Sequence, residues 1–188
     1  MYMKTFLIMI LFTFASSSFA KLTTQLGFNY TTDSDTQKSF EYSKLNGALF
    51  IGASVGKKDK LYIGQNVSKY TRTDKQDGLE SAEIGVLEIG PKILYYFNED
   101  KNIFFSATWN PYAKGERKDA NTNKISGWSY NVALGYHLKI NRFFYLGASL
   151  NYHNLNITTE TDSSNQETEV SQTFTSIFPL IELVFHFR

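Results

Sequence analysis

The sequence predicts an all-β fold, an eight-stranded antiparallel up-and-down transmembrane β-barrel. Three observations predict it. Hydrophobic residues recur with a period of two, polar clusters interrupt them at regular intervals, and small side chains dominate the polar face of each segment. The chain has 188 residues, 42% hydrophobic and 20% charged, which fits one folded domain. A formal net charge of +1 gives no basic field that would indicate nucleic-acid binding.

The first 20 residues have the pattern of a secretory signal peptide. Lys4 supplies a positive start, residues 6–14 form an apolar core, and a small-residue segment ends at Ala20, where we expect cleavage. A membrane anchor is the alternative, but the apolar run is too short for a spanning helix. We therefore divide the chain into a signal peptide, residues 1–20, and a barrel, residues 21–188.

The first half of the barrel alternates with two irregularities. Residues 22–31 alternate cleanly between apolar and polar positions. In the next segment Phe40 and Tyr42 have the opposite parity to the apolar residues that follow, so we expect a β-bulge within residues 44–47. In the third strand, Gln65 interrupts the apolar face.

The second half shows the clearest alternation, over residues 126–140 and 143–153, and the final strand continues it. Pro91, Pro111 and Pro179 lie inside strands, on the apolar face. Each proline removes a backbone donor, and a closed barrel has no free edge. We therefore expect a bulge or an unpaired position at each one.

Polar segments divide the chain into four hairpins. We expect four longer loops near residues 32–39, 74–81, 115–124 and 159–168, and three short turns at residues 57–60, 98–102 and 140–142. Long loops that alternate with short turns are typical of membrane β-barrels, whose short turns face the periplasm.

The connection after residue 139 predicts a register. Residues that face each other in an antiparallel pair must point to the same side of the sheet, so the connection must contain an odd number of residues. The simplest choice is Ile140–Arg142, with positive φ at Asn141 or Arg142. This register would place Tyr130 opposite Tyr152 on the outer face. It would also place Ser129 opposite His153 in the interior.

The composition of the polar face distinguishes a membrane barrel from a soluble lipocalin-type barrel. The strands of both alternate between apolar and polar residues. A soluble barrel would present Lys and Glu to water, whereas this face is mostly Gly, Ala, Ser, Asn and Thr, which suits a narrow lumen. The apolar face carries aromatic residues near both ends, as interfacial girdles do. They are Tyr95, Phe97, Phe144, Phe185 and Phe187 near the short turns, and Trp109, Trp128, Tyr130 and Tyr152 toward the long loops.

With these features the chain resembles the small eight-stranded outer-membrane barrels of Gram-negative bacteria, of the OmpA-barrel, OmpX and OmpW type. The resemblance rests on the signal peptide, the loop rhythm, the stretch Gly90–Phe97 and the final strand, where Phe185 and Phe187 alternate and Arg188 follows. It implies export to the cell outer membrane, insertion by the barrel-assembly machinery, contact with outer-membrane lipid and lipopolysaccharide, and a monomer. It does not define a function, because such barrels include adhesins, anchors, enzymes and pores.

Parity places a set of polar side chains in the lumen. Lys92 and Glu182 lie at matching depths on opposite sides of the barrel and are expected to meet across it. The set either fills the lumen as a structural network or gates small ions. Its members are Glu88, Lys92, His137, Lys139, His153, Glu182 and His186.

No pattern for catalysis or for a cofactor is present. A barrel lipid-A deacylase places Ser two residues after its His, whereas Leu155 follows His153 and Lys139 follows His137 at that spacing. Three scattered His and no Cys leave no metal-ligand spacing. We expect a non-enzymatic barrel with a structural or surface-interaction role. A narrow, porin-like pore is the alternative, and a lipid-modifying enzyme the second.

The polar loops carry opposite charges. The third is basic and the fourth is acidic, so they could attract each other or contact lipopolysaccharide phosphates. The simpler interpretation is that these charged loops are only solvated by water. The basic residues are Lys114, Arg117, Lys118 and Lys124, and the acidic residues are Glu160, Asp162, Glu167 and Glu169.

Overall fold

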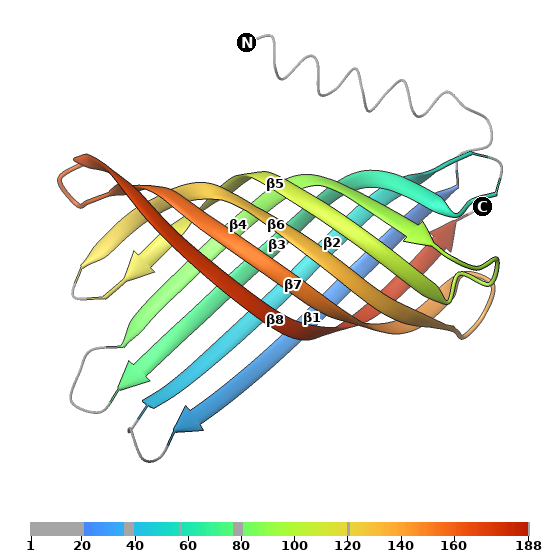
Figure 1. Cartoon of the computed structure of the whole chain (residues 1–188), viewed down its shortest axis with the longest axis horizontal. Helices are drawn as coiled ribbons and strands as arrows, with labels where there is room; N and C mark the ends of the chain where they lie inside the picture. The colour runs from blue at the N-terminus through green and yellow to red at the C-terminus, as the bar shows by residue number, and fades with distance from the viewer. Residues whose placement is uncertain (1–20, 36–39, 57, 77–80, 120, 188) are drawn as a thin grey trace, which may run out of the picture.

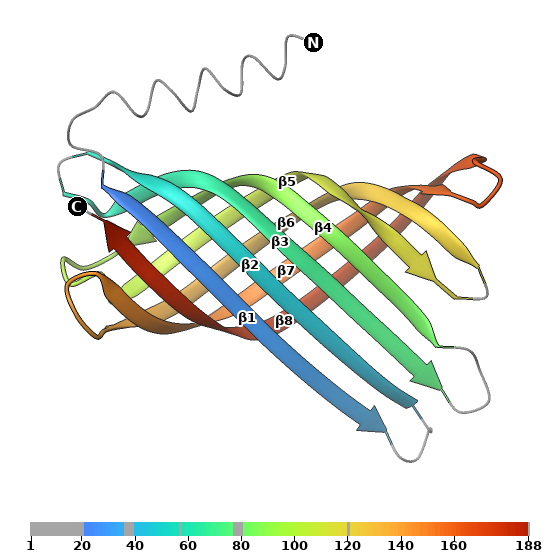
Figure 2. The same cartoon turned by 180° about the vertical axis from the view of Figure 1, so that it is seen from behind.

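A computed structural model describes residues 21–35, 40–56, 58–76, 81–119 and 121–187. The predicted signal peptide lies outside these residues. The described chain forms one closed antiparallel barrel in which each strand pairs with the next and β8 returns to β1 (Figures 1 and 2). This confirms the predicted fold class. The strands are β1 (Leu22–Asp35), β2 (Phe40–Val55), β3 (Leu61–Gln76), β4 (Ala82–Tyr96), β5 (Ile103–Lys118), β6 (Thr122–Lys139), β7 (Phe144–Thr161) and β8 (Glu167–Phe187).

The barrel has two distinct ends. Leu22, Phe187 and the connections at residues 56–60, 97–102 and 140–143 lie at one end, which we call the terminal end. The other end, which carries the four remaining connections, is the distal end. Among the described residues, no helix is long and apolar enough to cross a membrane.

The outer face of the barrel is apolar over much of its length, as parity predicts. Leu134 and Leu150 face each other across β6 and β7 and are 58% and 59% exposed. Their neighbours Ala133 and Asn151 are buried in the interior. A soluble barrel would show the reverse arrangement, so the membrane-type polarity of this section is confirmed.

Two of the three strand prolines lie at register shifts. The β4–β5 ladder shifts between Ile89 and Lys92, a step that includes Pro91. The β5–β6 ladder shifts between Asn110 and Ala113, a step that includes Pro111. The predicted bulges are therefore confirmed, because a bulge tolerates a residue without a donor.

Pro179 lies at the point where the barrel seam opens. Pairing between β1 and β8 runs from Leu22–Phe187 to Phe28–Ile181 and stops there. The amide of His186 donates to the carbonyl of Phe143 next to β7, so the odd-numbered amides of β8 point toward β1. Pro179 is the next odd position and has no N–H to donate. Beyond it the two strands diverge toward the distal end (Figures 1 and 2).

The predicted bulge in the second strand is wrong. The registers of β2 with β1 and with β3 run without a shift from Phe40 to Val55. Tyr42 is half-buried inside the barrel, where the cations of Lys44 and Arg72 lie 5.2 and 5.8 Å from its ring centre. The apolar and polar positions exchange faces here because Tyr42 points into the barrel, where its ring packs against these cations.

The third predicted long loop, residues 115–124, is largely strand. β5 continues to Lys118 and β6 begins at Thr122, so most of the basic segment is sheet. β8 is the longest strand, with 21 residues. A tilted strand needs only about 9–11 residues to cross a bilayer, so the barrel extends well beyond a membrane.

The predicted register of the β6–β7 hairpin is wrong by two residues. Tyr130 lies opposite Asn154, and Tyr152 lies opposite Val132. Five residues separate the paired Lys139 and Tyr145, an odd number as predicted but two more than expected. Asn141 Oδ1 accepts the amides of Phe143 and Phe144 at 2.8 and 2.9 Å. This side-chain turn removes the need for positive φ. A shift of two preserves the faces, which is why the face assignment holds while the pairing does not.

Candidate functional site

The interior of the barrel holds six of the seven predicted polar residues. Lys139 is exposed at the terminal end and does not belong to this network. The other six are buried, namely Glu88, Lys92, His137, His153, Glu182 and His186.

The first cluster, which we call the lower cluster, is built over a glycine. Gly147 of β7 lies opposite both His137 of β6 and Glu182 of β8. Because Gly147 has no side chain, His137 Nε2 reaches Glu182 Oε2 at 2.8 Å. A Cβ on Gly147 would lie 2.2 Å from the His137 ring. Ser149 donates to the second carboxylate oxygen at 2.8 Å.

Two polar contacts hold the imidazole of His137. A carboxylate only accepts, so Nε2 carries the proton that points to Glu182. Nδ1 lies 3.0 Å from the hydroxyl oxygen of Tyr96. The same hydroxyl lies 3.4 Å from His186 Nε2. The lower cluster therefore joins β4, β6, β7 and β8 in one buried network.

An aromatic layer borders the lower cluster. The ring of Phe104 stacks on His137 with 4.2 Å between centroids, and the Tyr62 ring lies 5.5 Å from that of His186. These rings leave little open space around the charged groups. The layer consists of Phe50, Tyr62, Leu94, Tyr96 and Phe104, all at most 1% exposed.

A second cluster, the upper cluster, lies nearer the distal end. His153 Nε2 donates to Glu88 Oε1 at 2.8 Å, which joins β7 to β4 across the lumen. Ser68 donates to the other oxygen of Glu88 at 3.0 Å. The ring of Tyr70 lies 5.3 Å from the His153 ring. Both buried carboxylates are thus paired with an imidazole and a hydroxyl, which offsets the cost of removing them from water.

Lys92 does not pair with Glu182. Its Nζ donates to Gln25 Oε1 at 2.7 Å and lies 5.1 Å from the Phe50 ring centre. Glu182 is instead occupied by His137 and Ser149. The predicted ion pair is therefore wrong, because Gly147 lets a nearer imidazole reach the carboxylate. The predicted Ser129–His153 pairing is also wrong, since Ser129 lies opposite Leu155 and His153 lies opposite Asn131.

One small cavity lies inside the barrel. A cavity of about 40 Å³ lies between the two clusters and is lined by Lys92, Glu88, Asn131 and His153 among others. It has room for only a few water molecules. His153 Nδ1 and Asn131 Oδ1 have no hydrogen-bond partner among the described residues.

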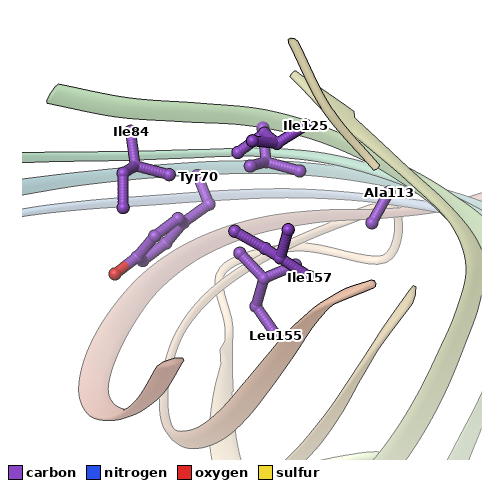
Figure 3. Close-up of a cluster of buried hydrophobic side chains, with 7 residues drawn as sticks. Tyr70, Ile84, Ala113, Ile125, Leu155 and Ile157 are labelled. Atoms are coloured by element: carbon purple, nitrogen blue, oxygen red, sulfur yellow. The ribbon is translucent and has the colours of Figure 1, made fainter. Parts of the chain in front are cut away.

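An apolar cluster lies in the interior on the distal side (Figure 3). Its side chains come from five neighbouring strands and are at most 7% exposed. Here the polarity of the barrel is inverted, with apolar residues inside and Lys114, Glu116 and Lys118 exposed outside. The members of this cluster are Tyr70, Ile84, Val86, Ala113, Ile125, Leu155 and Ile157.

The terminal rim carries a charged pocket of about 230 Å³ that Lys139 helps to line. Lys21 forms an ion pair with Asp59 there, and the backbone amide of Lys21 donates to Ser54 Oγ at 2.9 Å. Burial alone would raise the pKa of Asp59, but hydrogen bonds from Lys21 and Ser54 lower it below its usual value. These contacts fix the start of β1 against the β2–β3 connection.

The network consists of hydrogen bonds among buried carboxylates, imidazoles and hydroxyls. In the lower cluster Ser149 donates to Glu182 and not to a histidine. Among the described residues, no group of three potential metal ligands is present. Parity could have identified Tyr96 and Ser149, because both lie on the lumen side, but their partners depend on barrel geometry.

Comparisons with known proteins agree with the fold. No protein-family model matches the chain, and no curated protein matches it. The structure of Neisserial surface protein A is similar over 90% of this chain and 97% of that one, at a TM-score of 0.53 and 11% identity. A major outer membrane protein from Thermus thermophilus is similar over 89% and 99%, at a TM-score of 0.50 and 13% identity. At such identities the likeness concerns the fold, and the chain has the fold of the small outer-membrane β-barrel proteins.

Proposed function

We propose that this chain is a non-enzymatic outer-membrane β-barrel with a closed lumen and a structural or surface-interaction role. The packing of the barrel interior is the observation that supports the proposal. Two buried carboxylate–imidazole clusters lie between an aromatic layer and an apolar cluster. A water-filled pore needs a continuous polar path, and a cavity of about 40 Å³ supplies none.

The outer surface supports the membrane part of the proposal. Large apolar side chains face outward on all eight strands, and such a surface is stable in lipid but not in water. The polar distal section would stand outside the cell, since membrane barrels carry their longer segments on that side. The terminal rim would then face the periplasm.

Location and orientation can be tested together in a Gram-negative host. Density separation of membranes should place the chain in the outer-membrane fraction. Trypsin added to intact cells should cut the distal segment around Lys118 and Lys124 and spare Lys58 and Lys60. Inner-membrane location, or cutting at the terminal rim first, would contradict the proposal.

Absence of catalysis has a direct test. Lipid-A mass spectra from cells with and without the chain should be identical. Loss or gain of an acyl chain that disappears in His137→Ala or His153→Ala would establish an enzyme instead.

A further inference from the structure

The residue directly before β1 is held by β2 and by the connection that follows β2. The main-chain nitrogen of Lys21 donates to Ser54 Oγ at 2.9 Å, and the carbonyl of Lys21 accepts from the Ser54 amide at 2.8 Å. The Ser54 side chain also hydrogen-bonds to Asp59, and the side chain of Lys21 forms an ion pair with the same carboxylate. The main-chain nitrogen of Lys21 is therefore separated from a carboxylate by one hydroxyl group.

The backbone of the β2–β3 connection places this carboxylate. Asp59 has a φ of 50°, in the left-handed region that few residues other than glycine adopt. Such a conformation persists where the surrounding contacts hold it, and here those contacts are Lys21 and Ser54. Ser54 itself is only 8% exposed. The hydroxyl and the carboxylate are thus fixed in place at the start of β1.

This contact lies at the end of the seam where β1 and β8 are paired. Lys21 directly precedes Leu22, which lies opposite Phe187, and the pairing stops at Phe28. The carbonyl of Lys21 bonds to β2, so the alternation of a strand directs the amides of Leu22 and Thr24 toward β8. Holding Lys21 in place therefore also holds the paired part of the seam.

We propose that removal of the signal peptide completes this contact, because the new α-ammonium group of Lys21 binds the Ser54 hydroxyl and the Asp59 carboxylate and so locks the seam. The inference rests on the cleavage predicted after Ala20. A signal peptidase hydrolyses the Ala20–Lys21 bond with one water. Ala20 leaves as a carboxylate, and the nitrogen of Lys21 becomes an ammonium group. Before cleavage this nitrogen is a neutral amide with one N–H, whereas the ammonium group has three donors and a positive charge beside a carboxylate.

The test removes the charge of this nitrogen and keeps an N–H on it. The full chain is expressed with its signal peptide in a Gram-negative host, and the mass of the purified barrel identifies its first residue. The α-amine is acetylated in urea at about pH 6.5, where lysine side chains are protonated, and the barrel is refolded in lipid vesicles. The wild type is compared with Asp59→Asn and with a control, Asp100→Asn, which lines the same rim pocket from the β4–β5 connection.

Hydrogen exchange at Thr24 and Leu26 reports on the seam. An ion pair at a protein surface shifts an equilibrium by up to about fivefold. Acetylation should therefore speed this exchange about two- to fivefold in the wild type and in Asp100→Asn, and much less in Asp59→Asn. The ion pair between the Lys21 side chain and Asp59 is the same with and without acetylation, so it does not contribute to the difference. Exchange at Leu134 should stay unchanged.

Two results would overturn the lock. One is the same effect of acetylation in all three proteins, and the other is a mature barrel that begins at a residue other than Lys21. Heat-dependent gel migration shows whether each variant is folded, so faster exchange cannot be mistaken for misfolding. Membrane fractionation and conductance test the proposed function separately, because neither depends on the charge of the first residue.

Discussion

His137 and Glu182 lie 2.8 Å apart across a single glycine, Gly147 of the intervening strand. The two residues belong to β6 and β8, and neither could reach the other over a larger side chain. Gly147 thus converts two separate lumen residues into one buried acid–imidazole pair. The pair is fully enclosed, with exposures of 0% and 1%.

Removing the charge of Glu182 should therefore destabilise the barrel. Glu182→Gln leaves His137 and Ser149 without their carboxylate, and breaking a buried pair costs about 3–5 kcal/mol. Urea unfolding of the refolded barrel in lipid vesicles measures this loss. His137→Phe can stack on Phe104 in its place, so the double variant should recover part of the loss. Strict additivity in this cycle would show that the pair is not coupled.

Alanine at Gly147 tests the same pair through sterics. Its Cβ would lie 2.2 Å from the His137 ring, whereas a Cβ on Gly47 would have nothing within 4 Å. Gly147→Ala should cost about 1–3 kcal/mol of unfolding free energy, and Gly47→Ala should cost much less. Equal costs in a vesicle unfolding assay would contradict the packing described around His137.

The outward position of Leu134 predicts how a charge is tolerated there. Leu134→Arg should cost about 2–4 kcal/mol in a lipid bilayer, because the guanidinium would enter the hydrocarbon. Ala133→Ser, one residue away but facing the lumen, should cost far less. Should both variants unfold at the same urea concentration, the outer surface would not be in contact with lipid.

At the seam between β1 and β8, a substitution is expected to stabilise the barrel rather than destabilise it. Pro179→Val restores a donor toward β1, opposite Tyr30, where the present pairing stops two residues earlier. One added backbone hydrogen bond should stabilise the barrel by about 1 kcal/mol. Hydrogen exchange at Tyr30 and Thr32 should slow, while exchange at Leu134 stays unchanged. Unaltered exchange at Tyr30 would mean that Pro179 does not set the end of pairing.

The sequence predicted the strands and their faces because the side-chain period of two is a local property. Six of the seven expected lumen residues are buried for the same reason. The missing backbone donor of proline also predicted the irregular positions at Pro91, Pro111 and Pro179. It could not give side-chain partners, since these depend on register. Asn141 shows this limit, because its side-chain hydrogen bonds hold a connection two residues longer than predicted, and the β6–β7 pairing shifts by two.

The strands and the apolar interior of the distal section were not predicted, for a different reason. Its residues are polar in sequence, which is typical of loops, yet Lys114 and Lys118 lie on a strand. Inside that section Ile84 and Ile157 form an apolar interior like that of a soluble barrel. One chain therefore combines two opposite polarity patterns. A single parity rule applied throughout required a bulge after Tyr42 that the β2 registers do not contain.

The closed lumen is the central claim, and conductance of the refolded barrel in a planar lipid bilayer tests it most directly. Insertion can be verified by heat-dependent gel migration of the same sample, with a porin as the positive control for the bilayer. The clusters around Glu182 and Glu88, together with the apolar cluster at Tyr70, predict a baseline without unit steps. Reproducible unit conductance steps from the folded monomer would contradict the closed lumen and establish a pore.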